Sequence, residues 1–153
     1  SKAVQFDSMK NAGTPTAAVS EGAKGLSGAG KLFFEGENHL ANERFDDAIS
    51  AFKRVLSEFP DDTEYHLKAD MEIGRALQAK GDHAGAIRHT SQLVQKNPKM
   101  PNVGDALFLI GRSYKESGDR AKAQSFLKRS ESVAGDNSAL KRKIAKALSE
   151  LEG

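Results

Sequence analysis

Apolar residues recur at three- and four-residue steps along most of the chain, with polar residues between them. The pattern is clearest near the end, where Leu140, Ile144, Leu148 and Leu151 share one helical face with Ala147. Such spacing is typical of amphipathic helices that pack one face on a core. We therefore expect an all-α protein. The pattern predicts helices over residues 31–42, 45–58, 64–80, 83–96, 102–117, 120–133 and 137–151.

The predicted helices belong to a repeat with a period of 38 and then 37 residues, the separations between Gly36, Gly74 and Gly111. An alanine follows each of these glycines after twelve residues, at Ala48, Ala86 and Ala123. Two helices that cross closely need small residues at the crossing, since larger side chains push the axes apart. We therefore expect three helical hairpins, with each glycine facing its alanine.

The predicted turns carry residues suited to helix ends. Gly81 and Gly118 fit the left-handed position after a helix, because glycine has no Cβ to clash there. Asp82 and Asp119 come next and fit the N-cap of the following helix, where a carboxylate accepts from free backbone N–H groups. Each hairpin is therefore expected to turn within a few residues.

The repeat carries the signature residues of a known family most fully in its third copy, at Leu107, Ile110, Gly111, Tyr114, Gly118, Ala123 and Leu127. With these residues the chain resembles the tetratricopeptide-repeat (TPR) family over roughly residues 31–135. The resemblance implies a right-handed α-solenoid of three TPR hairpins plus a C-terminal capping helix. The repeats would span about 31–60, 64–98 and 102–135, and the capping helix 137–151, within a TPR domain of residues 30–153.

The repeats are longer than the family's usual 34 residues, and Phe59-Pro60 and Asn97-Pro98 close their second helices. This longer form looks like the bacterial envelope branch, and is similar to the C-terminal TPR domain of periplasmic Tol–Pal coordinator proteins. The resemblance implies a bacterial protein of the periplasm or cell envelope, with the cytoplasm as the alternative.

The first 29 residues contain many glycines and small residues and show no helical stripe, so we interpret them as a flexible N-terminal arm or linker.

The whole chain has 23 basic and 21 acidic residues, a balance without the strongly basic patch of a nucleic-acid-binding protein. No apolar run approaches the 18 residues that suggest a membrane span. The absence of cysteine excludes disulfides.

Motifs for catalysis are incomplete. Gly25–Lys31 matches the glycine-rich phosphate-binding string, but Leu32 stands where a Ser or Thr would hold magnesium, and no strand precedes it. No two histidines stand four residues apart on one helix as metal ligands would. We therefore predict no enzyme, no metal and no cofactor.

The resemblance implies that the first helix of each hairpin lines a concave groove. Its expected lining residues are Phe33, Glu37, Met71, Arg75, Gln78, Phe108, Arg112 and Lys115. An apolar strip beside arginines suits a partner protein or peptide with acidic and apolar residues, because guanidinium groups bind carboxylates in pairs of hydrogen bonds. A solvated face covered by arginine stems is the alternative.

Two functions follow from this sequence. The first is a non-catalytic protein–protein interaction module, a scaffold or adaptor that binds its partner in the groove. The alternative is a self-assembly module that oligomerises through the N-terminal arm or the capping helix.

Overall fold

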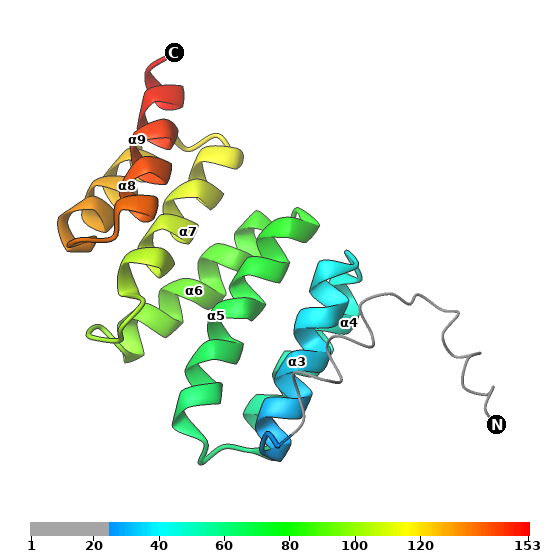
Figure 1. Ribbon diagram of the computed structural model, residues 1–153. Coiled ribbons are helices and arrows are strands. Elements are labelled where there is room, and N and C mark those ends of the chain that lie inside the picture. The colour runs from blue at the N-terminus through cyan, green and yellow to red at the C-terminus, as the bar shows by residue number, and fades with distance from the viewer. Residues whose placement is uncertain (1–24) are drawn as a thin grey trace. The chain divides into compact units, whose positions relative to one another are not determined.

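The computed structural model describes residues 25–153, and within them the regular structure is entirely α-helical (Figure 1). Most of the predicted N-terminal arm lies outside the described residues. The helices are α3 (Gly28–Ala41), α4 (Phe45–Glu58), α5 (Thr63–Lys80), α6 (His83–Lys96), α7 (Val103–Glu116), α8 (Arg120–Val133) and α9 (Ser138–Glu152). All seven predicted helices are therefore present, and three of them have the predicted bounds.

The largest difference is at the start of α3, which begins at Gly28 rather than at residue 31. Ser27 is its N-cap, and the Ser27 hydroxyl accepts a hydrogen bond of 3.1 Å from the backbone N–H of Gly30. Gly28 and Ala29 therefore belong to the helix and not to the arm. The glycine-rich string thus supplies an N-cap and a first helical turn.

The described helices divide into two compact units whose boundary lies between Ala69 and Asp70. In the first unit α3 packs on α4. Phe33 on α3 lies between two other aromatic residues, with its ring centroid 5.4 Å from that of Phe52 and 5.4 Å from that of Tyr65. This aromatic cluster forms much of the first unit's core.

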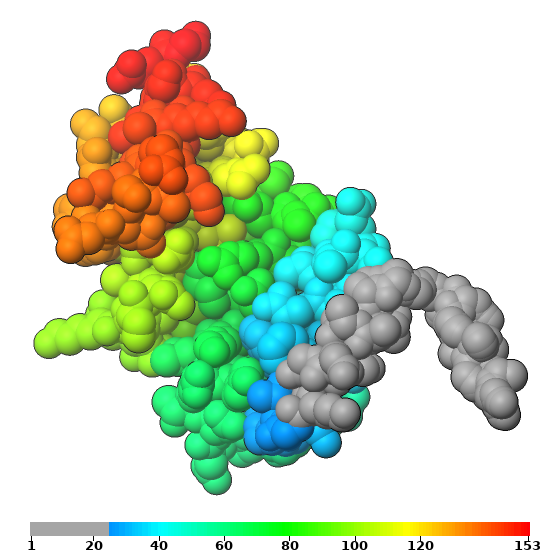
Figure 2. All heavy atoms as spheres, viewed as in Figure 1, coloured from blue at the N-terminus to red at the C-terminus, as the bar shows by residue number. Residues whose placement is uncertain are grey.

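In the second unit α7 packs on both α6 and α8, and α9 packs on α8 and α7. Figure 2 shows the orange-red and red atoms of α9 lying against the orange atoms of α8. The apolar line of α9 is buried in a cluster with α8 that includes Leu127, Leu140, Ile144, Ala147 and Leu151. The terminal helix therefore covers the apolar side of α8, as predicted for a cap.

The turns follow the prediction closely. Gly81 and Gly118 have φ angles of 96° and 93°, in the left-handed region that glycine favours. The Asp82 carboxylate accepts from the N–H of Gly85, and the Asp119 carboxylate accepts from the N–H of Lys122. These caps satisfy backbone donors that a helix start leaves free.

The predicted pairing of each glycine with an alanine is wrong. Gly36 lies against Phe52 and Gly111 lies against Leu127, each one turn beyond the expected alanine. The missing side chain makes room for a large one from the opposite helix. The alanines are still fully buried: Ala48, Ala86 and Ala123.

The second hairpin fills the same space differently. Gly74 faces the hydroxyl of Thr90, and a Cβ built on Gly74 would lie 3.0 Å from Cδ2 of Leu109 on α7. Thr90 is fully buried, and its Oγ1 has no hydrogen-bond partner among the described residues. Leu109 thus supplies some of the bulk that Thr90 lacks.

No helix in residues 25–153 has the length and hydropathy needed to cross a bilayer.

Candidate partner-binding site

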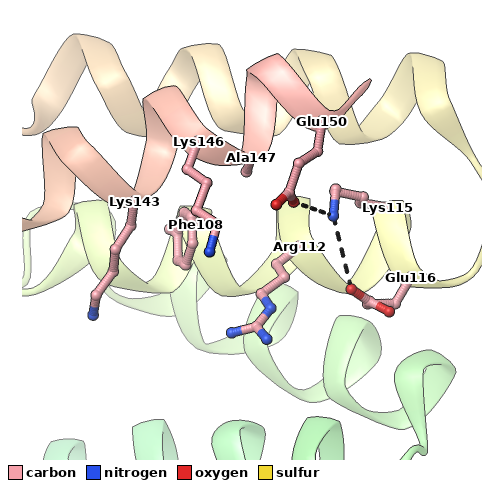
Figure 3. A pocket seen from close by; sticks show the side chains of 8 residues that line it. All are labelled: Phe108, Arg112, Lys115, Glu116, Lys143, Lys146, Ala147 and Glu150. Atoms are coloured by element: carbon pink, nitrogen blue, oxygen red, sulfur yellow. Dashed lines mark ion pairs between the residues drawn. The ribbon is translucent and has the colours of Figure 1, made fainter. Parts of the chain in front are cut away.

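The second unit contains an open pocket of about 440 Å³ between α7 and α9 (Figure 3). Each helix contributes residues at three- and four-residue steps, so each presents one face to the pocket. The lining residues are Phe108, Arg112, Lys115, Glu116, Lys143, Lys146, Ala147 and Glu150.

The apolar part of the pocket consists of Phe108 and Ala147. Phe108 is half-buried and packs against the core cluster of α8 and α9. Ala147 is buried and belongs to that cluster. Because Phe108 is anchored in the core and still borders the pocket, it offers a fixed apolar surface to a ligand.

Lys115, one of the four cations in the pocket, has a structural role. Lys115 Nζ lies 2.7 Å from Glu150 Oε1 and 3.9 Å from Glu116 Oε2 (Figure 3). The hydrogen bond from Lys115 and the positive charge of Lys115 hold the pKa of Glu150 below its ordinary value, with smaller help from Lys146 and Arg112. Lys115 was predicted as a binding cation, and it also joins α7 to α9.

The other three cations are not neutralised in this way. Arg112, Lys143 and Lys146 are exposed, and none forms an ion pair within the part of the chain that the structure describes. In Figure 3 the guanidinium of Arg112 points away from the Lys115–Glu150 pair. Four cations face two carboxylates in the pocket, so its net charge is positive. A ligand with carboxylates would therefore be attracted to it.

Three predicted site residues on α5 lie elsewhere in the second unit. Met71 is buried, and Arg75 is exposed and pairs with Glu72 at 2.7 Å. The Gln78 amide donates to Ser113 Oγ at 2.8 Å and to the Leu109 carbonyl at 3.3 Å, so it ties α5 to α7. None of the three lines the pocket.

The remaining two predicted residues, Phe33 and Glu37, belong to the first unit, whereas the pocket is made by the second unit alone. Phe33 is buried among Phe52 and Tyr65. The predicted apolar strip is therefore not exposed at Phe33 or Met71, and Phe108 alone keeps an accessible surface. Each of these residues stands one helical turn before a glycine of the repeat. Such a residue belongs to the core when neighbouring aromatic or apolar side chains cover it.

Sequence reasoning missed the contribution of α9. Lys143, Lys146 and Glu150 are exposed on this helix, and all three border the pocket. Their steps of three and four residues place them on one stripe beside the buried line of α9. This stripe could have indicated the contribution of α9 from the sequence, because a terminal helix that packs on α7 must place one of its sides close to α7.

Two of the histidines have ordinary structural partners, whereas Nδ1 of His83 is buried without a hydrogen-bond partner among the described residues. Nε2 of His89 lies 3.0 Å from Oδ1 of Asp70, and Nδ1 of His39 accepts from Nε of Arg44 at 3.2 Å. Residues 25–153 contain no group of three side chains that could hold a metal ion.

Comparison with known proteins agrees with this architecture. Two family models described as Tetratricopeptide repeat match residues 39–103 and 105–130, which together exceed half of the chain. No protein of curated function matches the sequence significantly.

Two similar solved structures come from bacteria. One is the type III secretion chaperone SycD of Yersinia enterocolitica in complex with a peptide of the translocator YopD, with a TM-score of 0.68 and 18% identity over 80% of this chain and 90% of that one. The other is PcrH of Pseudomonas aeruginosa, with a TM-score of 0.71 and 20% identity over 84% of this chain and 96% of that one. At such identities the likeness concerns the fold.

Proposed function

Since the chain belongs to the tetratricopeptide-repeat family, we propose that it is a non-catalytic adaptor whose partner segment binds in the α7–α9 pocket. The observation that carries this proposal is the fixed Phe108 surface beside Arg112, Lys143 and Lys146, which have no ion pair among the described residues. The partner segment would carry an apolar side chain for Phe108 and carboxylates for the cations.

The energetic roles of these groups differ. Burial of an apolar side chain against Phe108 supplies affinity, because it removes apolar surface from water. The cations speed encounter and select for acidic segments, since exposed charges contribute less to affinity than to rate and specificity. The fold of SycD, a protein solved with a bound peptide, supports peptide binding as a use of this architecture.

Self-assembly through the capping helix is less well supported. The apolar line of α9 is already buried against α8 of its own chain, so little apolar surface of α9 remains for a second copy. The periplasm or cell envelope of a bacterium, and the similarity to Tol–Pal coordinator proteins, stay predictions.

A random peptide library displayed on phage tests the proposal. Selection on the wild-type chain should enrich peptides with acidic and apolar residues, and a Phe108→Ser/Arg112→Glu variant should bind these peptides far more weakly. Arg88→Glu is the matched control, because Arg88 is an exposed α6 residue outside the pocket. Selected peptides should bind this control as tightly as the wild type. Peptides that bind the double variant equally well would refute the pocket.

A further inference from the structure

The exposed sides of α8 and α9 carry a surplus of positive charge. Residues 120–152 contain eight Lys or Arg and four Asp or Glu. Of the eight cations only Lys122 forms an ion pair within the described residues, with Asp119 at 4.0 Å. The other seven are exposed: Arg120, Lys128, Arg129, Lys141, Arg142, Lys143 and Lys146.

Some cations of the first unit are paired with neighbouring carboxylates, whereas Lys31 and Lys53 are exposed without an ion pair among the described residues. Arg54 pairs with Glu58 at 2.7 Å, and Lys68 pairs with Glu64 at 3.1 Å. Such pairs three or four residues apart are the usual arrangement on solvated helices. On α8 and α9 most cations lack such a pair among the described residues, so the positive charge is concentrated on these two helices.

The exposed side of α8 also carries apolar groups among its cations. Lys122, Phe126, Arg129 and Val133 follow one another at steps of four, three and four residues, so they form one stripe. Val133 is 48% exposed. Phe126 stacks on Tyr114, with a centroid distance of 5.6 Å.

The cations of this stripe lie over those rings. Lys122 Nζ is 5.5 Å from the centroid of the Tyr114 ring, and Arg129 Cζ is 4.8 Å from that of Phe126. The charged groups therefore lie over the ring faces, and Val133 is the more exposed apolar residue of the stripe. Amphipathic helices that lie at the surface of a bilayer combine apolar and basic side chains in the same manner.

We propose that a basic surface of the C-terminal hairpin docks on an anionic lipid bilayer. This basic surface consists of Lys122, Lys128, Arg129, Lys141 and Arg142. The cations of this surface are spread along two helices and do not converge on one pocket. A bilayer of anionic lipids presents negative charge over a wide area, so it can neutralise such scattered cations without a complementary shape. The surface is separate from the α7–α9 pocket, so the inference goes beyond the proposed function and does not depend on it.

A nucleic acid fits this surface less well. Aromatic residues that bind single strands need open ring faces on which bases stack. Here Tyr114 and Phe126 stack on each other and hold Lys122 and Arg129 over their rings. The rings therefore support the cations and leave no platform for bases.

Vesicle sedimentation with the full chain tests the proposal. Vesicles of phosphatidylcholine with about a third phosphatidylglycerol should pellet the protein at low salt, and pure phosphatidylcholine vesicles should not. Lys128→Glu/Arg129→Glu and Lys141→Glu/Arg142→Glu should each weaken the binding about tenfold or more, since each cation near an anionic surface contributes about fivefold. High salt should release the protein.

The matched control is Lys96→Glu/Lys99→Glu, which makes the same change of net charge at exposed residues outside the basic surface. It should keep most of the binding, and circular dichroism should show that all variants remain helical. An equal loss in the control would overturn the proposal, because net charge alone would then explain the binding. Failure to pellet with anionic vesicles while binding polyglutamate would also overturn it and would point to an acidic protein.

Discussion

Gly111 on α7 and Leu127 on α8 meet so closely that any side chain at residue 111 would crowd Leu127. A Cβ built on Gly111 would lie 3.0 Å from Cγ of Leu127 and 3.1 Å from its backbone nitrogen. Leu127 is fully buried, and its amide cannot move without α8. The missing side chain of Gly111 therefore sets the distance between the two helices.

Replacing Gly111 by leucine should force α7 and α8 apart. Overpacking in a close contact costs about 1–3 kcal/mol, and more where backbone must shift. The melting temperature, measured by circular dichroism, should fall by several degrees. Ala145→Leu is the control, since Ala145 is exposed on α9. An unchanged melting temperature for Gly111→Leu would show that the close contact between Gly111 and Leu127 does not contribute to stability.

Replacing Thr90 by valine should stabilise the protein. Valine keeps the shape of threonine and removes a hydroxyl that is fully buried without a hydrogen-bond partner among the described residues. A buried polar group left unpaired costs about 1–3 kcal/mol. The midpoint of urea unfolding should rise for Thr90→Val and fall for Thr90→Ser, which keeps the hydroxyl and loses a methyl group. A lower midpoint for valine than for threonine would mean that the hydroxyl is satisfied in solution.

The helices could be predicted from the sequence because each has a local signal. Asp82 and Asp119 cap the helices that they precede, and Gly81 and Gly118 end the helices before them, through contacts within a few residues. The start of α3 was missed because Ser27 stands among glycines that also suit a linker. Local signals thus locate a helix end well where the residues around it fit a helix end and not also a linker.

The site was harder to predict because it depends on contacts between residues far apart in the chain. Phe108 and Met71 hold equivalent places in their repeats, yet Phe108 borders a pocket and Met71 is buried. Whether such a residue is exposed depends on its neighbours in space, which the repeat pattern does not specify. The contribution of α9 was missed for the same reason, since it requires the packing of α9 on α7.

The pair formed by Lys115 and Glu150 should be visible in a carboxyl titration. The pKa of Glu150 lies below the ordinary value of 4.5, first because of the hydrogen bond from Lys115. A group with a lowered pKa in the folded state stabilises the fold above its ordinary pKa and loses that contribution as the pH falls through the folded-state pKa. The Glu150 contribution should therefore disappear below pH 4.5.

Carbon-detected NMR of the Glu150 carboxyl provides the measurement. In a Lys115→Met variant the pKa should return toward its ordinary value, whereas Lys141→Met should leave it unchanged. An equal rise in both variants would show that the general positive charge of α9, rather than the contact with Lys115, lowers the pKa.

Removing residues 137–153 should make the protein aggregate. The deletion exposes Leu127 and Ala123 on α8, which α9 now covers. The ends of helical-repeat proteins need a polar cover, because an open apolar face associates with other copies. Light scattering after size exclusion should show large, concentration-dependent species. A monomeric and fully helical truncated chain would contradict the capping role of α9.

Mutation of the pocket should separate the roles of its aromatic and basic residues. With a peptide from the phage selection, Phe108→Ala should weaken binding about fivefold or more, since truncation of a central aromatic anchor costs about 1 kcal/mol or more. Arg112→Ala should weaken it less, because Arg112 is exposed and water screens its charge. High salt should slow association without abolishing binding, which isothermal titration and stopped-flow kinetics would measure.

Controls for this comparison come from the same chain. Arg88→Ala should leave affinity unchanged, because Arg88 does not line the pocket. Circular dichroism should show that Phe108→Ala remains folded, since Phe108 also packs on the core cluster. If Arg112→Ala lost more affinity than Phe108→Ala, the pocket would bind by charge, and the apolar part of the proposed partner would be wrong. Hydrogen exchange that is slowed by peptide only outside α7 and α9 would place the site elsewhere.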